Sequence, residues 1–142
     1  MSDGWAEPAL RQQIEGLVAM LNRGQVLEAL EQFYAPEARV FENDYLFAED
    51  RLEALARQRP FIEPCLSVDG DVRLVYQDLG RGISVLNNQT RFDHPEYGQG
   101  KVDGVHVLYW QGERVVRENY FSGTKAGEAL TFWESLAGSD PA

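Results

Sequence analysis

Two residues suited to proton transfer stand on short extended runs of the sequence, the carboxylate Glu42 and the imidazole His106. Side chains alternate along a strand, so Glu42 shares a face with Val40 if residues 38–42 are extended. His106 has apolar neighbours, and a partly buried imidazole beside a carboxylate would form a proton-transfer pair near neutral pH. We therefore predict Glu42 and His106 as catalytic residues. The alternatives are a solvated glutamate at a strand end and a structural histidine.

Three further candidates alternate along the last predicted strand, namely Arg117, Asn119 and Phe121. We expect all three to face inward, so that Asn119 could bind a substrate oxygen or orient a water molecule. A cross-strand hydrogen bond is the alternative for Asn119. Trp110 belongs to the aromatic residues that could line an apolar cavity for a small hydrophobic ligand.

The other polar residues of the predicted strands are interpreted as surface positions. Asp103, Glu118 and His94 are expected at an interface or in solvent. Arg91 and Asp93 share a face, and such a pair is more often a surface salt bridge than an anion site. No cysteine or histidine pattern has metal-ligand spacing, so we predict neither a metal site nor a cofactor.

The composition indicates one folded, acidic domain. The 142 residues are predicted to form a single domain over 1–142, with a core at about 8–123, a size that needs no disulfide or metal. Asp and Glu number 23 against 13 Lys and Arg, which gives a net charge of −10. Such a surface repels phosphate backbones and anionic lipids, so nucleic acid and membranes are not expected partners. The lone Cys65 and the lack of a signal-peptide pattern favour a cytoplasmic location.

The hydrophobic pattern predicts helices first and strands afterwards. Helices are expected from Pro8 to a stop at Gly24, from Val26 to Phe33, over 50–59 with a break at Pro60, and over 126–136. Runs rich in β-branched and aromatic residues predict four strands, at 65–79, 82–94, 101–111 and 113–122. Hairpin turns are expected at 80–81, 97–98 and 111–112, and residues 138–142 are expected to fray.

Three helices followed by a four-stranded antiparallel meander define an α+β fold. A long sheet with helices on one face curls around them, which makes a cone with a pocket. We expect the three N-terminal helices inside the cone, a short helix at the C-terminal end, and a homodimer through the outer face of the sheet.

Four stretches carry a more specific signal: Leu21-Asn22-Arg23-Gly24, the run from Phe33 to Ala38, Val40-Phe41-Glu42-Asn43, and the run from Trp110 to Phe121. Together with the order of the elements over residues 10–122, they resemble the nuclear-transport-factor-2-like superfamily. The resemblance is to its SnoaL-like and ketosteroid-isomerase-like branch. This fold hosts enzymes and non-enzymes alike.

The resemblance also implies positions for a site. By count along the chain, Glu42 falls at the base of the ketosteroid isomerases, His106 at their protonated aspartic acid, and Leu17 at their tyrosine donor. The water-holding positions of the limonene epoxide hydrolases fall at Val40, Glu42 and Asn119. The implied substrate contacts are Asn119, Arg117, Phe121, Trp110, Leu17 and Val40.

The residues and the resemblance together predict a cofactor-independent enzyme or binder of a small hydrophobic carbonyl or epoxide compound. Glu42 would move the proton and His106 would share or stabilise charge. Isomerisation, cyclisation and hydration are all reactions that such a pair of acid–base residues could catalyse. The alternative function is a non-catalytic module of the same fold that binds a ligand or dimerises.

Overall fold

The computed structural model describes residues 6–139, and side chains up to residue 137. The chain begins with α1 (Ala6–Asn22), α2 (Val26–Phe33), the hairpin β1 (Tyr34–Glu42) and β2 (Tyr45–Ala48), and α3 (Arg51–Ile62). Seven strands follow, β3 (Ser67–Asp69), β4 (Val72–Asp78), β5 (Ile83–Asn88), β6 (Arg91–His94), β7 (Gly98–Lys101), β8 (Gly104–Gln111) and β9 (Arg114–Ser122). The last element is α4 (Thr124–Ser139). The predicted fraying at 138–142 falls largely outside the described residues.

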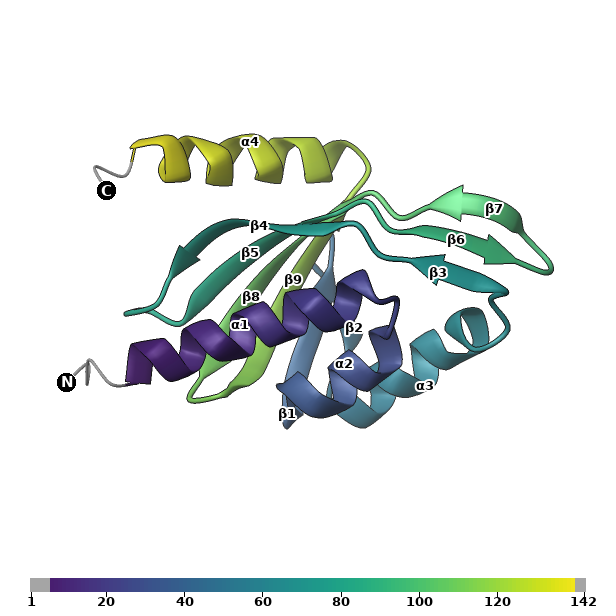
Figure 1. Cartoon of the computed structure of the whole chain (residues 1–142), viewed down its shortest axis with the longest axis horizontal. Coiled ribbons are helices and arrows are strands. Elements are labelled where there is room, and N and C mark those ends of the chain that lie inside the picture. Colours follow the sequence, from purple (N-terminus) through teal and green to yellow (C-terminus); the bar gives the residue numbers. More distant parts are fainter. Residues whose placement is uncertain (1–5, 140–142) are drawn as a thin grey trace.

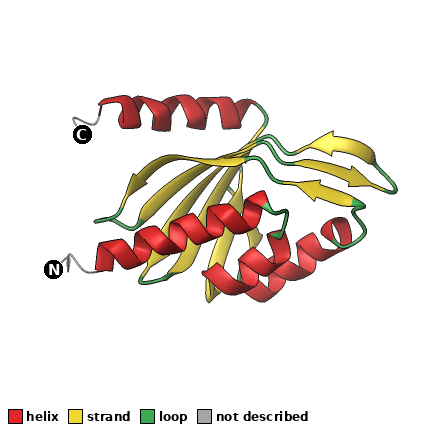
Figure 2. Cartoon of the chain, in the orientation of Figure 1, coloured by secondary structure: helices red, strands yellow, loops and turns green. Residues whose placement is uncertain are grey.

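The main sheet has six strands in the order β2-β1-β9-β8-β5-β4 and curves around α1, α2 and α3 (Figures 1 and 2). The predicted α+β cone is therefore confirmed. The sheet is mixed rather than purely antiparallel, because β1 pairs parallel to β9 while the other neighbours pair antiparallel. The short hairpin of β1 and β2 was not predicted. Its turn residues, Asn43 and Asp44, both have positive φ.

Two of the predicted strands are each divided in two, at 70–71 and 89–90, and the strand predicted at 101–111 is β8, separated at 102–103 from β7, which begins at the predicted turn. On one side of these breaks the chain belongs to the main sheet. On the other side it forms a small sheet of order β3-β6-β7. The breaks lie together, since the Gln89 N–H donates to the Asp71 carbonyl and the Val102 N–H donates to the Thr90 carbonyl, both at 2.7 Å. The breaks in these strands therefore lie side by side, where the main sheet meets the small sheet.

The helices follow their predicted patterns with two differences. In α1 the buried residues are Leu10, Ile14 and Leu17, at three- and four-residue spacing. Pro60 does not break α3, which continues to Ile62 because the turn after Pro60 is closed by the Glu63 N–H on the Arg59 carbonyl at 2.9 Å. The C-terminal helix begins and ends slightly beyond its predicted limits.

Gly24 marks the point where the helical layer meets the small sheet. Its φ is +76°, and a Cβ atom there would lie 2.1 Å from the Val68 carbonyl oxygen. A glycine is therefore required both by the left-handed conformation and by the close approach.

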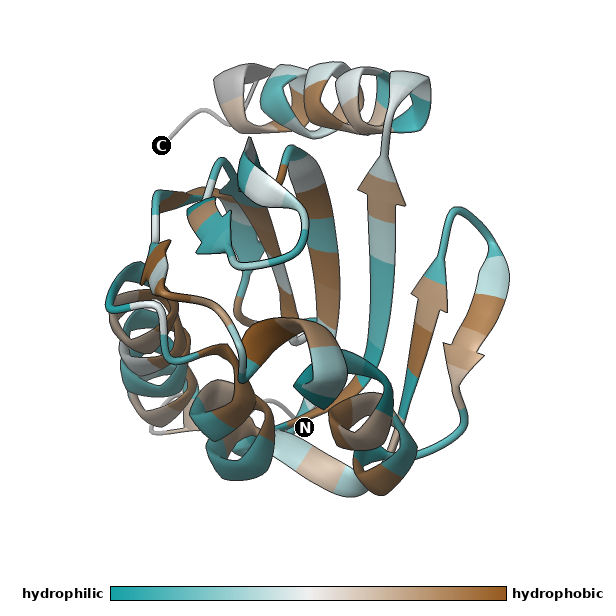
Figure 3. Ribbon diagram, turned by 90° about the vertical axis from the view of Figure 1, so that its right-hand side faces the viewer, coloured by the Kyte–Doolittle hydropathy of each residue, from teal (hydrophilic) through white to brown (hydrophobic). Residues whose placement is uncertain are grey.

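The two faces of the main sheet are covered by different helices, as Figure 1 shows with α4 above the sheet and α1–α3 below it. A large core lies between the sheet and α1–α3. A smaller core on the outer face joins Val85, Val105 and Val107 to Ala126 of α4, with Trp133 packed against it. Both α4 and the helices of the opposite face carry hydrophobic bands (Figure 3). Part of the outer face, where we expected a second copy to bind, is thus covered by the chain itself.

Candidate functional site

A cavity of about 460 Å³ lies between the concave face of the main sheet and the three helices. A volume of this order suits a small organic ligand. Its apolar lining comes mainly from α1, α2, β5 and β8, with Leu17, Leu30, Leu86 and Leu108 among the contributors. Its polar lining includes Arg57 and Gln58 from α3, Thr90 from the break between β5 and β6, and six strand residues, Tyr34, Glu42, Asn88, His106, Glu118 and Tyr120.

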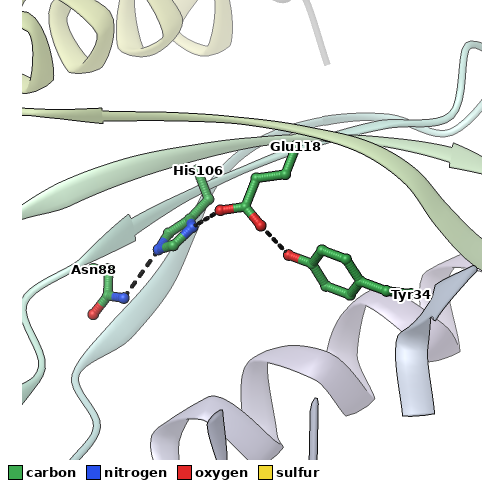
Figure 4. Close-up of polar contacts among 4 residues, drawn as sticks. All are labelled: Tyr34, Asn88, His106 and Glu118. Carbon is green, nitrogen blue, oxygen red and sulfur yellow. Dashed lines mark hydrogen bonds and ion pairs between the residues drawn. The ribbon is translucent and has the colours of Figure 1, made fainter. Parts of the chain in front are cut away.

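Four of the polar side chains form one continuous chain of contacts across adjacent strands (Figure 4). The Tyr34 hydroxyl donates a short hydrogen bond to Glu118 Oε1. Glu118 Oε2 lies 2.5 Å from His106 Nδ1, and His106 Nε2 lies 3.0 Å from Asn88 Nδ2. We call these residues the Tyr34–Glu118–His106–Asn88 chain. It joins β1, β9, β8 and β5, which are neighbours in the sheet.

A bulge in β9 explains why Glu118 faces the cavity. Tyr109 pairs with Arg117 and Trp110 pairs with Val115, so Val116 is an extra residue on β9. Strict alternation would place Val115, Arg117 and Asn119 on one face, but an extra residue reverses the alternation beyond it. Glu118 therefore points toward the helices, and the interpretation of Glu118 as a solvent or interface residue is wrong.

Burial and charge act against each other at Glu118. Burial raises the pKa of its carboxyl, but the charge of His106 and the hydrogen bonds from His106 and Tyr34 lower that pKa by more. The net direction is down, so Glu118 is ionised at neutral pH. Burial, followed by the charge of Glu118 and the hydrogen bond to it, raises the pKa of Tyr34 well above its ordinary value. Tyr34 is therefore a neutral hydrogen-bond donor.

Tyr120 lies beside this chain. Its ring contacts the His106 ring with centroids 4.7 Å apart. Burial, then the charges of Glu42, Glu118 and Asp103, raise the pKa of Tyr120 to about 12. No hydrogen bond to another described residue engages its hydroxyl, so this O–H can donate to a ligand.

Four of the predicted site residues line the cavity, namely Leu17, Val40, Glu42 and His106. Glu42 is exposed, and it pairs in register with Tyr120. The carboxylate that contacts His106 is Glu118 and not Glu42. His106 is thus in a carboxylate–imidazole pair, but with a different partner from the one we predicted.

The structure does not place the other four predicted residues in the cavity. Arg117 and Asn119 lie on the opposite face of β9, where the Arg117 guanidinium sits over the Phe41 ring at 4.3 Å and donates to Asn119 Oδ1 at 3.2 Å. Phe121 packs in the outer core beneath α4. The Val116 bulge is the reason for all three corrections. Trp110 is buried in the large core, and its indole N–H donates to Ser84 Oγ at 2.8 Å.

The position of Trp110 gives a test of the core. Trp110→Phe is expected to lower the free energy of unfolding by about 1–2 kcal/mol, because it removes a buried hydrogen bond and leaves the Ser84 hydroxyl without a partner. Trp133→Phe, on half-buried α4, is the matched control and should cost less. Urea unfolding of both variants measures the difference. Equal losses would contradict a specific contribution of the Trp110–Ser84 bond.

Sequence reasoning missed Tyr34, Asn88, Glu118 and Tyr120. Tyr34 directly follows the helix predicted from Val26 to Phe33, and Asn88 lies inside the strand predicted at 82–94. The one available signal for Glu118 was the adjacent pair Val115-Val116, which interrupts the alternation of the last strand.

Among the described residues, no three His, Cys, Asp or Glu side chains gather as they would around a metal ion. Within the same part of the chain, no helix combines the length and apolar character that a membrane crossing requires.

The lowered pKa of Glu118 predicts a loss of stability in acid. A carboxyl whose pKa is lower when folded than when unfolded stabilises the fold wherever it is ionised. The contribution is complete above the ordinary pKa of 4.5 and is lost as the pH falls through the lowered folded value. Urea unfolding from about pH 7 to about pH 3 should therefore show a steeper decline in the wild type than in Glu118→Gln. Parallel declines would contradict the lowered pKa.

Fold and cavity together define an α+β cone that encloses a cavity of ligand size. Solved structures with this fold include a protein from Mesorhizobium loti described as a candidate SnoaL-like polyketide cyclase, which is 14% identical with a TM-score of 0.65. That match covers 79% of this chain and 97% of the other. A candidate SnoaL-like polyketide cyclase from a Jannaschia species is 14% identical with a TM-score of 0.64, covering 87% and 93%.

A nuclear-transport-factor-2-like protein of unknown function from Burkholderia pseudomallei is 15% identical with a TM-score of 0.60, covering 87% of this chain and 95% of its own. At such identities the likeness concerns the fold. No protein-family model matches the sequence, and no curated protein matches it.

Proposed function

We propose that the protein binds a small, neutral, mostly apolar molecule in the cone and moves a proton on it, with His106 as the base. The observation that carries this proposal is the Tyr34–Glu118–His106–Asn88 chain on the wall of the cavity. A carboxylate that contacts one ring nitrogen orients the imidazole and stabilises the imidazolium that forms when the other nitrogen takes a proton.

The charges around the cavity favour a neutral ligand. Glu42 and Glu118 contribute two carboxylates, and Arg57 contributes a guanidinium that lies 3.7 Å from Glu53. A surplus of negative charge in a partly desolvated cavity disfavours an anionic ligand. The apolar lining suits the hydrocarbon part of a carbonyl or epoxide compound.

In the proposed step, His106 Nε2 takes a proton from a carbon next to a carbonyl group. The electron pair of the broken C–H bond moves to the carbonyl oxygen, and the Tyr120 hydroxyl donates a hydrogen bond to that oxygen. In a compound with a conjugated double bond, return of the proton to another carbon completes an isomerisation. In a cyclisation the carbanion attacks the carbon of a second carbonyl group, whose π electrons move to its oxygen, and the imidazolium returns the proton to that oxygen. Hydration would use the same base on a water molecule. Glu42 is a second candidate for carrying the proton at the open side of the cavity.

Exchange of substrate hydrogen for deuterium tests the proposal before the natural substrate is known. A panel of small neutral ketones is incubated with the protein in D₂O, and NMR follows the loss of the signal next to the carbonyl. We expect exchange above the buffer rate, and its loss in His106→Gln. Asn119→Ala, on the opposite face of β9, is the matched control and should exchange normally.

Binding of these ketones without protein-dependent exchange would overturn the catalytic role. It would favour the alternative function, a non-catalytic ligand-binding module, which the mostly apolar cavity also supports. Exchange that persists in His106→Gln but is lost in Glu42→Gln would assign the base to Glu42.

We also propose, as expected from the sequence, a homodimer through the part of the outer sheet face that α4 leaves uncovered. Sedimentation at micromolar concentration tests it, and a strict monomer would contradict it.

A further inference from the structure

Asn88 stands at the bend where β5 leaves the main sheet. Its Oδ1 accepts from the Thr90 backbone N–H at 3.0 Å and from the Thr90 hydroxyl at 2.5 Å. A backbone N–H can only donate, so it identifies the amide oxygen, and the Nδ2 end of Asn88 must point the other way. That end lies 3.0 Å from His106 Nε2. Thr90 thus fixes which group of Asn88 meets the histidine.

This orientation determines the protonation of the imidazole. Asn88 Nδ2 can only donate, so His106 Nε2 must accept and carries no proton. On the other side of the ring, an ionised Glu118 can only accept, so His106 Nδ1 must donate. Two independent neighbours therefore assign the same neutral tautomer, with the proton on Nδ1.

We infer that Asn88, oriented by Thr90, is a positioning residue that holds His106 neutral with Nε2 as the proton acceptor. This inference rests on the proposed role of His106 as the base, because a base needs a free electron pair on the side of the substrate. The Asn88 bond to Nε2 joins neutral groups, so a substrate can replace it.

The same geometry opposes protonation of the ring. An N–H on Nε2 would face the N–H of Asn88, and the amide cannot turn over without abandoning the bond from the Thr90 backbone N–H. Glu118 acts in the opposite direction, because its charge favours the imidazolium. The other charged or titratable groups that line the cavity around the ring are Tyr120 from β9, Tyr34 and Glu42 from β1, and Arg57 from α3. Asp103, just before β8, interacts electrostatically with Tyr120.

Asn88→Asp keeps the shape of the side chain but replaces the N–H₂ group that opposes a proton on His106 Nε2 with a carboxylate oxygen. The new carboxylate can still accept from Thr90, and it attracts a proton to Nε2, so the ring lies between two carboxylates. We expect His106 to titrate at a higher pH than in the wild type, because a new opposite charge beside Nε2 favours the imidazolium. Deuterium exchange at neutral pH should then fall about tenfold or more, because little neutral imidazole remains.

Nitrogen-15 NMR of the imidazole on the full chain is the deciding measurement. In the wild type we expect Nδ1 to show the shift of a protonated nitrogen and Nε2 that of an unprotonated one. In Asn88→Asp we expect the titration to move upward. A wild-type ring protonated on Nε2, or an unchanged titration in folded Asn88→Asp, would overturn the inference.

A second pair of variants covers a failure of Asn88→Asp to fold. Asn88→Ala removes the amide group that donates to His106 Nε2, while Thr90→Val removes only the hydroxyl and keeps the backbone N–H that identifies the Asn88 oxygen. We expect the His106 titration to move upward in Asn88→Ala, because no N–H then opposes a proton on Nε2, and the wild-type tautomer to persist in Thr90→Val. An unchanged titration in Asn88→Ala, or a Thr90→Val ring protonated on Nε2, would overturn the inference. The predicted tautomer without any deuterium exchange would instead refute the proposed function and leave the positioning by Asn88 standing.

Discussion

Glu118→Gln is expected to slow deuterium exchange by about 10²–10⁴-fold, the range that a well-placed general base contributes. Glutamine keeps the shape of the side chain but removes the charge that stabilises a protonated His106. It also offers an N–H₂ group, which can favour the wrong tautomer of the ring. The loss of stability should be modest, about 1–2 kcal/mol, because one oxygen can still accept a hydrogen bond.

Glu113→Gln is the control, because it removes the same charge from an exposed side chain at the β8–β9 turn, outside the cavity. The measurement is the exchange rate together with the nitrogen-15 titration of His106. If Glu118→Gln changed both of them no more than Glu113→Gln does, the Glu118–His106 pair would have no role in the reaction.

Local patterns were enough to predict the layers of the fold. The three- and four-residue spacing of Leu10, Ile14 and Leu17 defines the buried face of α1, and the turn at 111–112 defines the β8–β9 hairpin. These features depend on neighbours in the sequence. The bends at 70–71, 89–90 and 102–103 do not, because they arise where three strands part from the main sheet together. The sequence of any one strand therefore does not predict where these three breaks lie.

The candidate site depends on details of the same kind. His106 could be found from the sequence because an imidazole on an apolar strand is conspicuous. Glu118 could not, since a single extra residue at Val116 decides which face it occupies. Tyr34 meets Glu118 only through the parallel pairing of β1 with β9, a long-range contact that alternation does not reveal. Residue types thus indicated acid–base chemistry, and strand register determined which side chains contact His106.

The bend in β5 connects the fold with this chemistry. Asn88 and Thr90 close the bend by hydrogen bonds of the kind that asparagine makes two residues ahead. The same bonds turn the Asn88 amide toward His106. A feature that separates two sheets therefore also orients a group of the cavity wall.

Gly104→Ala is expected to displace Tyr120 from the cavity wall while leaving its hydroxyl in the protein. A Cβ atom at residue 104 would lie 2.2 Å from the Tyr120 hydroxyl oxygen and 2.4 Å from the ring carbon that bears it, so the ring must move. Overpacking of this kind costs about 1–3 kcal/mol. The contact between the Tyr120 and His106 rings should be lost with it.

Titration of the tyrosines by ultraviolet absorbance measures this displacement. The pKa of Tyr120, raised to about 12 by burial and by the charges of Glu42, Glu118 and Asp103, should fall toward its ordinary value of 10.0. A phenol whose pKa is raised in the folded state stabilises the fold at lower pH and loses that contribution as the pH rises through about 12. The alkaline loss of stability should therefore shrink in Gly104→Ala.

Two further variants are compared with Gly104→Ala: one removes only the Tyr120 hydroxyl, and the other adds a methyl group far from the cavity. Tyr120→Phe keeps the contact with His106 and removes only the donor, so it should fold normally and slow deuterium exchange. Gly127→Ala, where no atom lies within 4 Å, controls for the added methyl group. If Gly104→Ala lowered the pKa of Tyr120 from about 12 but left exchange unchanged, the hydroxyl would have no part in holding the substrate oxygen. If both variants slow exchange while His106 titrates as in the wild type, the donor acts on the substrate and not through the base.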